Sequence, residues 1–304
     1  MGMETARALK VGLFLSGAER SARERWNNLK AMAQHPEAVG FDSIWLADHL
    51  MIPQSMPGQT ELGRWECWSM LSALAAVTSR VELGTLVTCT GFRPPAVLAK
   101  MADTVEEISN GRLILGLGAG YYEREFQAFG LPFDHRTGRF EEALQIIHGL
   151  LRKGAIDFQG QYYEARDCEL RPRAPRPGGP PILIGARANR PRALRLTGQY
   201  ADYWNVFGCN TNEDFGAVRK AVDDACVKVG RDRATLQRTA SANIDLPGSE
   251  NSPAAVRAYR SSRAPTGGAP EEFADRLRAL AQHGISYVQL WLEPNTNSFP
   301  RRCA

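Results

Sequence analysis

RVELGTLVTCTGFRPPAVLAKMADTVEEISNGRLILGLGAG, the stretch from Arg80 to Gly120, decides the fold because it sets a helix between two apolar strands. Arg80–Thr88 and Arg112–Gly116 predict strands, and consecutive apolar residues within them are typical of strands buried on both faces. Pro94–Ser109 predicts a helix whose first turn carries prolines, where they cost least. The stretch therefore predicts a parallel βαβ unit.

The same alternation extends in both directions along the chain. The predicted strands are Val11–Leu15, Ser43–Ala47, Arg80–Thr88, Arg112–Gly116, Pro181–Gly185, Tyr203–Phe207, Leu236–Leu246 and Ile285–Leu292. The predicted helices are Glu19–Val39, Trp65–Thr78, Pro94–Ser109, Gly138–Lys153, Arg190–Gly198, Glu213–Gly230 and Glu271–His283. Eight such units favour a closed barrel over an open sheet. We expect an α/β fold, a (β/α)8 TIM barrel, as a single domain over residues 1–304 with loop excursions near 157–181 and 247–270.

Composition and charge exclude several classes of protein. The net charge of +4 comes without a dense run of Lys or Arg, so no nucleic-acid partner is expected. The 6 cysteines are scattered, and neither a C-x-x-C pair nor zinc-ligand spacing occurs. We therefore expect no metal, and reduced thiols in the cytoplasm. No stretch approaches the roughly 20 apolar residues of a membrane span, so no membrane partner is expected.

Polar residues and glycines recur where the predicted strands end. In an α/β barrel the chemistry lies at the carboxyl ends of the strands. These ends carry Ser16, Asp48, His49, Thr85, Thr88, Gly118, Ala119, Gly120, Gly185, Ala186, Arg187, Asn205, Asn243 and Glu293. The set is what a site at one barrel mouth needs, although strands that end in polar loops produce much of it as well.

Two of these ends suggest specific chemistry. A His beside an Asp, as at Asp48-His49, can donate or accept a proton, or the His can cap a loop. The run Gly116–Gly120 lacks the G-x-G-x-x-G spacing of a dinucleotide site. Its glycines either let a flat ring or a phosphate approach the backbone or form a tight turn.

Two further features of the sequence are a candidate anion site and a pair of tryptophans. The helix that opens near Arg190-Pro191-Arg192 follows Arg187, and clustered Arg at a helix N-terminus suits an anion; the alternative is solvated side chains. Trp65 and Trp68, three residues apart, are predicted to share one packed face of a helix. P-loop, nucleophile-elbow and H-E-x-x-H motifs are absent from the sequence. The simplest expectation is therefore that a bound organic cofactor supplies the reactive group.

Eight stretches, in order between Val11 and Gly208, resemble the bacterial luciferase-like superfamily of flavin- and deazaflavin-dependent oxidoreductases. They are GFDSIWLADH (Gly40–His49), TSRVELGTLVT (Thr78–Thr88), RPPAVLAK (Arg93–Lys100), ISNGRLILGLGAGYYEREFQAFGLPF (Ile108–Phe133), RFEEALQII (Arg139–Ile147), FQGQYY (Phe158–Tyr163), PPILIGAR (Pro180–Arg187) and LRLTGQYADYWN (Leu194–Asn205). The resemblance implies a (β/α)8 barrel with the ring of FMN or coenzyme F420 in its mouth.

The resemblance also implies roles for single residues. A non-prolyl cis peptide is implied at Leu86–Val87, against one face of the ring. The implied cofactor-binding residues are Thr85, Leu86, Val87, Thr88, Gly118, Ala119, Gly120 and Tyr121, with Gly185, Ala186 and Arg187 at the ribityl-phosphate arm. Asp48 and His49 match the positions that face the reactive edge of the ring. The sugar-phosphate dehydrogenase branch of the family has Glu where this chain has Tyr121, which argues against that activity.

The resulting expectation is an enzyme that transfers a hydride between FMN or coenzyme F420 and a small organic substrate, with Asp48 and His49 as catalytic residues. A monooxygenase that uses reduced FMN and O2 is the alternative, and a non-catalytic flavin-binding protein is the third. The resemblance further implies a homodimer and a separate flavin or F420 reductase. The sequence does not identify the substrate.

Overall fold

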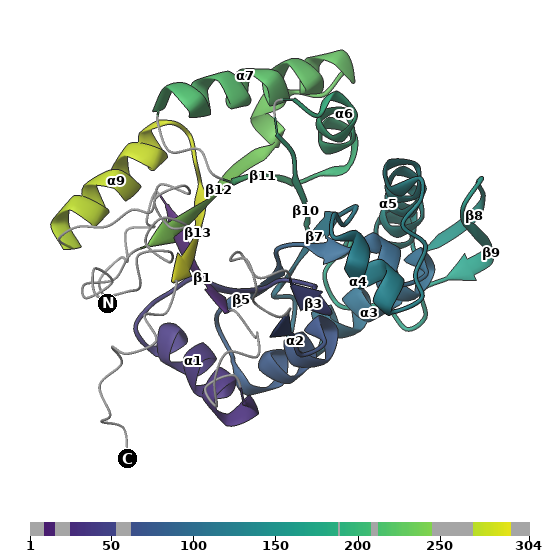
Figure 1. Ribbon diagram of the computed structural model, residues 1–304, viewed down its shortest axis with the longest axis horizontal. Helices are drawn as coiled ribbons and strands as arrows, with labels where there is room; N and C mark the ends of the chain where they lie inside the picture. Colours follow the sequence, from purple (N-terminus) through teal and green to yellow (C-terminus); the bar gives the residue numbers. More distant parts are fainter. Residues whose placement is uncertain are drawn as a thin grey trace.

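Eight parallel strands form a closed barrel (Figure 1). A computed structural model of the chain describes residues 9–15, 25–52, 62–187, 189–207, 212–244 and 270–292. The barrel strands are β1 (Lys10–Leu15), β2 (Ser43–Leu46), β5 (Glu82–Thr85), β7 (Leu113–Gly118), β10 (Ile182–Gly185), β11 (Tyr203–Phe207), β12 (Gln237–Ile244) and β13 (Tyr287–Leu292). Each pairs in parallel with the next, and β13 pairs with β1 to close the ring. The predicted (β/α)8 barrel is confirmed.

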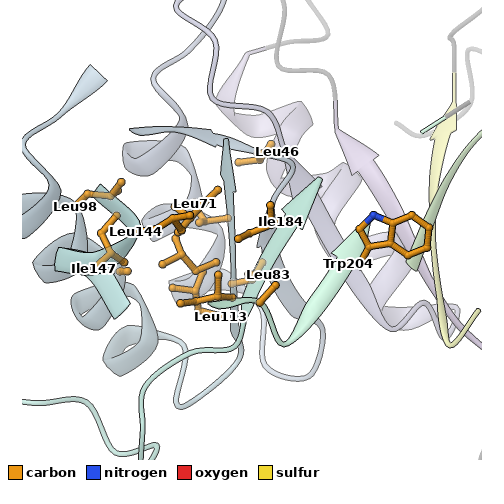
Figure 2. Packing of buried hydrophobic residues seen from close by; sticks show 14 of the residues in the cluster. Leu46, Leu71, Leu83, Leu98, Leu113, Leu144, Ile147, Ile184 and Trp204 are labelled. Atoms are coloured by element: carbon orange, nitrogen blue, oxygen red, sulfur yellow. The ribbon is translucent and has the colours of Figure 1, made fainter. Parts of the chain in front are cut away.

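Helices surround this ring of strands (Figure 1). They are α1 (Trp26–Ala38), α2 (Cys67–Val77), α3 (Pro95–Ile108), α5 (Arg136–Lys153), α6 (Pro191–Tyr200), α7 (Asn212–Lys228) and α9 (Pro270–Gln282). Their apolar faces pack on the outer face of the strands, as Figure 2 shows for Leu98 and Leu144 of α3 and α5. Burial of these faces is the main source of stability of the fold.

The barrel interior is filled by a smaller aromatic cluster around Trp45, which is fully buried. The Trp45 ring lies across two neighbouring strands at positions that have no side chain. A Cβ on Gly84 would lie 2.2 Å from this ring, and a Cβ on Gly12 would lie 2.5 Å from its Nε1. Glycine at both positions therefore makes room for Trp45 in the barrel interior.

Short elements interrupt the βα alternation. They are β3 (Met51–Ile52), β4 (Leu62–Gly63), β6 (Thr88–Cys89), α4 (Glu123–Ala128), the hairpin β8 (Ala155–Gln159) and β9 (Glu164–Glu169), and the 3-10 helices η2 (Thr90–Phe92) and η3 (Arg233–Thr235). The hairpin begins just before the predicted excursion 157–181 and takes up its first part; residues 247–269 of the second excursion lie outside the described residues. Across the described ranges, no helix has the length and apolar character needed to cross a membrane.

Two predicted helices differ from those in the structure. Helix α2 starts at Cys67 because the Glu66 carboxylate accepts the N–H groups of Trp68 and Ser69 and so caps it. Trp65 therefore precedes the helix and is 58% exposed, whereas Trp68 is 2% exposed, and the prediction that they share a helix face is wrong. Helix α1 contains Pro36 and ends two residues after it, at Ala38, as expected for a helix-ending proline.

Candidate functional site

The predicted site residues lie on four adjacent strand ends, which we call the rim: the carboxyl ends of β2, β5, β7 and β10. These strands are consecutive neighbours in the barrel. The rim carries Asp48 and His49 after β2, Thr85, Leu86, Val87 and Thr88 after β5, Gly118, Ala119, Gly120 and Tyr121 after β7, and Gly185, Ala186 and Arg187 after β10. The structure therefore gathers the predicted catalytic and cofactor-binding residues at one end of the barrel. Asn205 and Asn243 lie on β11 and β12, outside the rim. Ser16 and Glu293 lie outside the described residues.

The rim is open at Gly185. This glycine is exposed, and a Cβ placed on it would meet within 4 Å only the backbone oxygen of Asn205, at 3.9 Å. The opposite case holds at Gly118, where a Cβ would lie 2.7 Å from Cγ2 of Val87. The chain therefore leaves space at one strand end and packs tightly at another. The Leu86–Val87 peptide, which follows β5, is cis, as the resemblance implied.

The two threonines of the rim differ in their hydrogen bonds. Thr85 Oγ1 donates to the Gly116 carbonyl at 2.8 Å and accepts the Gly116 N–H at 2.9 Å, so this hydroxyl joins β5 to β7. Thr88 is also fully buried, but its Oγ1 has no hydrogen-bond partner within the described part of the chain. A buried hydroxyl without a partner is costly, which makes Thr88 the better candidate for contact with a ligand.

Asp48 is buried beneath the rim in an ion pair. Its carboxylate accepts two hydrogen bonds from Arg93, at 2.6 and 3.0 Å, and one from the Cys89 N–H at 3.1 Å. Arg93 also bonds to Glu66. Burial raises the pKa of Asp48, while Arg93 lowers it. Burial alone would lower the pKa of Arg93, but the two carboxylates outweigh it and raise that pKa, so the guanidinium stays charged.

His49 has a different partner from the one expected from its neighbour in sequence. Its Nδ1 lies 3.1 Å from Oε1 of Glu125, a carboxylate with a side chain only 1% exposed. Oε2 of Glu125 accepts the N–H groups of Leu50 at 2.6 Å and Met51 at 3.1 Å. The His49 side chain keeps 19% of its surface exposed, and its ring packs edge-on against Tyr121 at 5.4 Å between centroids. Glu125, which the sequence analysis did not single out, therefore holds His49 at the rim.

Cys89 lies at the same rim but is not a nucleophile. Burial raises the pKa of its thiol to about 12, so it carries no charge at neutral pH. Its sulfur instead packs beneath Gly120, where a Cβ would lie 2.6 Å from it. The described residues also hold no group of three or more His, Cys, Asp or Glu side chains that suits a metal ion.

A polar cavity of about 710 Å³ lies beside the rim. It is formed by the first turns of α5 and α6 and the loop between β8 and β9, and it is lined by Phe133, His135, Arg136, Thr137, Gly138, Glu141, Glu142, Gln145, Gln161, Tyr162 and Arg192. Arg136 donates to the Gly120 carbonyl at 2.8 Å, which connects the cavity to the rim. Arg136 and the two helix N-termini favour an anion here. The two carboxylates of the cavity are already bonded, Glu141 to Arg192 and Arg195 and Glu142 to the N–H groups of Gln161 and Tyr162.

The arginines predicted for an anion site have separate environments. Arg192 lines the cavity and pairs with Glu141 at 2.6 Å. Arg195 pairs with the same carboxylate, so the single negative charge of Glu141 is shared by two arginines. Arg187 is exposed. Arg136, which sequence reasoning missed, connects directly to the predicted glycine run. Arg136 lies in the gap between two stretches that resemble the family, Ile108–Phe133 and Arg139–Ile147, so the resemblance did not point to it.

Comparisons with known proteins identify the family to which the chain belongs. A family model described as luciferase-like monooxygenase matches residues 9–285. A phthiodiolone/phenolphthiodiolone dimycocerosates ketoreductase of Mycobacterium tuberculosis is 33% identical over 222 residues, which are 68% of this chain and 58% of the relative. A pyrimidine monooxygenase RutA of Caulobacter sp. is 33% identical over 218 residues, again 68% of this chain and 58% of the relative. The match thus spans less than two thirds of either relative.

Solved structures share the fold at low sequence identity. An F420-dependent secondary alcohol dehydrogenase, solved in complex with an F420–acetone adduct, superposes with a TM-score of 0.78 at 18% identity. The superposition covers 93% of each chain. This likeness supports the (β/α)8 fold.

Proposed function

Because the chain belongs to the luciferase-like monooxygenase family, we propose that it is an oxidoreductase that uses FMN or coenzyme F420 to transfer a hydride to or from a small organic substrate. The observation that carries this proposal is the open, glycine-lined rim with the half-buried His49 at its edge. Support also comes from a relative named as a ketoreductase and from a structural neighbour named as an F420-dependent alcohol dehydrogenase.

The rim fits a flat ring. Gly185 presents no side chain to the opening, and the buried Thr88 hydroxyl has a free hydrogen-bonding capacity within the described residues. Glycine at such a position allows a ring to approach the backbone closely. When bound, FMN or F420 supplies the two-electron chemistry that the side chains of the rim lack. We therefore keep Thr88, Gly118, Ala119, Gly120 and Gly185 as proposed cofactor contacts.

His49 supplies the proton. Reduction of a carbonyl adds a hydride to carbon and a proton to oxygen, and oxidation of an alcohol removes both. An imidazole is suited to this proton transfer near neutral pH. Asp48, held by Arg93 and the Cys89 N–H, is assigned a structural role in place of the catalytic one predicted from sequence. Tyr121, which is 65% exposed beside His49, is proposed to face the substrate.

The anionic arm of the cofactor is proposed to lie in the polar cavity. Both FMN and F420 carry a phosphate, and a helix N-terminus together with arginine is a suitable phosphate site. The cavity offers this combination at Arg136 and at the first turn of α6, next to Gly185, Ala186 and Arg187. This proposal extends the predicted arm site from β10 to the start of α5.

The experiment that tests the function is a separate titration of the purified protein with FMN and with F420, followed by absorbance and fluorescence. We expect one of them to bind at micromolar concentration with a shifted spectrum. If neither binds in that range, the proposed function is wrong.

A monooxygenase that uses reduced FMN and O2 is the second candidate, favoured by the relative named as a pyrimidine monooxygenase. The same rim and cavity serve both activities. Turnover with reduced FMN under ¹⁸O2 separates them, because a monooxygenase transfers one oxygen atom from O2 to its product and hydride transfer adds none. Oxygen uptake alone is not used, because free reduced FMN reacts with O2 without an enzyme. Selective binding of F420 would remove this alternative.

Three further proposals concern the surroundings of the enzyme. We propose a cytoplasmic location, supported by the free cysteines Cys67, Cys89, Cys168 and Cys226. A homodimer and a separate reductase that supplies reduced cofactor are proposed from family membership. Sedimentation and assays with an added reductase test these two proposals.

A further inference from the structure

We propose that Glu125 is the positioning residue that keeps a proton on Nδ1 of His49, so that Nε2 is the atom that exchanges a proton with the substrate. This inference rests on the proposed function, which makes His49 the proton donor or acceptor. It adds the identity of the reacting nitrogen and the group that selects it.

The contacts of Glu125 decide the direction of the hydrogen bond. Its two oxygens lie 3.1 and 3.3 Å from Nδ1 of His49, and Oε2 also accepts the Leu50 and Met51 N–H groups. The Glu125 carboxylate thus acts as a hydrogen-bond acceptor toward both backbone N–H groups. A carboxylate that acts as an acceptor takes a proton from the ring as well, so we infer that Nδ1 is the donor. The lone pair of a neutral ring is then on Nε2.

Other groups near His49 do not compete for this role. Asp48, the neighbour in sequence, uses both oxygens on Arg93 and one also on the Cys89 N–H. Tyr121 contacts the imidazole in a T-shaped ring pair, with centroids 5.4 Å apart. Within the described residues, the hydrogen bond at Nδ1 is thus made by Glu125.

Helix α4 fixes the place of this carboxylate. The residue after Glu125, Phe126, is 1% exposed and packs against Phe92 and Phe133 at centroid distances of 5.1 and 5.2 Å. The backbone N–H groups of Leu50 and Met51 then hold the carboxylate from the other side. A side chain locked by packing and by hydrogen bonds is what orients a catalytic imidazole.

The test measures the tautomer of His49 by NMR on protein labelled with ¹⁵N-histidine, at a pH about two units above the ordinary histidine pKa of about 6.5. The resonances are assigned by their loss in a His49→Asn variant. We expect Nδ1 of the wild-type protein to carry the proton. If Nδ1 of the wild-type protein is found unprotonated, that result alone overturns the proposal.

Glu125→Gln gives a sharper outcome. The single carbonyl oxygen of Gln is taken by the Leu50 and Met51 N–H groups, so its NH2 group faces Nδ1 and donates to it. We expect the proton to move to Nε2, which inverts the tautomer. Glu125→Asp, which keeps an acceptor-only carboxylate, should retain the wild-type form. The matched control is Glu123→Gln, an exposed residue of the same helix, which should leave the tautomer unchanged.

A merely structural role for Glu125 predicts a different result. In that case Glu125→Gln would lower the melting temperature and leave the proton on Nδ1, which contradicts the proposal. FMN and F420 titrations of the same proteins separate this failure from failure of the proposed function. If the wild-type protein binds neither cofactor, the proposed function is contradicted. If it binds a cofactor but His49 has the other tautomer, only the proposed role of Glu125 is contradicted.

Discussion

Arg93 bonds to two carboxylates at once, the buried Asp48 and the more exposed Glu66. Only 12% of its side chain is exposed, and the Asp48 side chain is 1% exposed. An ion pair at this depth adds little net stability relative to apolar residues, but removal of one partner leaves a charge buried alone. The ion pair also ties the end of β2 to the segment that follows β6.

Arg93→Met is therefore expected to lower the free energy of unfolding by about 3–5 kcal/mol. The double variant Asp48→Asn with Arg93→Met buries no charge and should recover at least half of that loss. Urea unfolding of both variants measures the difference. A loss below about 1 kcal/mol in the single variant would show that Asp48 is not held as the structure indicates.

Arg136 gives a test of the proposed arm site. Arg136→Met removes a cation that connects the cavity to Gly120, and we expect about tenfold weaker binding of FMN, or about 1.4 kcal/mol. The affinity for riboflavin, which lacks the phosphate, should fall by less than about twofold in this variant. Arg166→Met, an exposed arginine of β9 outside the cavity, is the control of equal charge. Equal losses for FMN and riboflavin would place the phosphate elsewhere.

Single residues show the limit of the sequence analysis most clearly. The motif placed Asp48 and His49 at the rim, where the structure finds them. Their partners lie far along the chain: Arg93 is 45 residues from Asp48, and Glu125 is 76 residues from His49. No local period connects such pairs, because only closure of the barrel brings them together.

At the scale of elements, the predicted barrel strands and main helices follow from apolar periodicity, with ends that shift by a few residues. The elements that were missed carry no such period. Helix α4 has six residues, and only two of them are buried: the acidic Glu125 and the aromatic Phe126. The hairpin β8–β9 is largely exposed and lies within a Pro- and Arg-rich stretch. Both elements contribute to the site or the cavity, so the sequence analysis missed part of the site with them.

Glu37 links helix α1 to the turn before β5 and makes that link sensitive to pH. Burial would raise its pKa, but the N–H groups of Arg80, Val81 and Ser79 outweigh burial and hold the pKa below its usual 4.5. A lowered pKa in the folded state gives stability that is present above about pH 4.5 and lost as pH falls through the folded value.

Glu37→Gln should therefore lower the melting temperature at neutral pH, and its effect should shrink as the pH falls below 4.5 and the wild-type carboxyl takes up a proton. Melting curves across this range measure the difference. Glu107→Gln, an exposed residue of α3, should show no such dependence. A constant difference between Glu37→Gln and wild type at all pH values would contradict the assignment.

For the whole molecule, closure of eight strands determines where chemistry can occur. It places four loop starts side by side, buries the Asp48–Arg93 pair beneath them, and leaves an open position at Gly185. The Trp45 cluster fills the interior, so the opening belongs to the rim and does not continue as a pore. The proposed enzyme depends on this single opening to receive a flat cofactor.

The most direct test is a titration of Gly185→Leu with whichever of FMN or F420 binds the wild-type protein. Among the described residues, a Cβ at this position meets only the Asn205 oxygen, at 3.9 Å, so the variant should fold with an unchanged melting temperature. Gly216→Leu is the matched control on α7, because a Cβ there meets no atom of the described residues within 4 Å. The account predicts that Gly185→Leu binds the cofactor at least about 100-fold more weakly, a loss of about 2.7 kcal/mol, and that Gly216→Leu keeps the wild-type affinity. Wild-type affinity in a folded Gly185→Leu protein would contradict it.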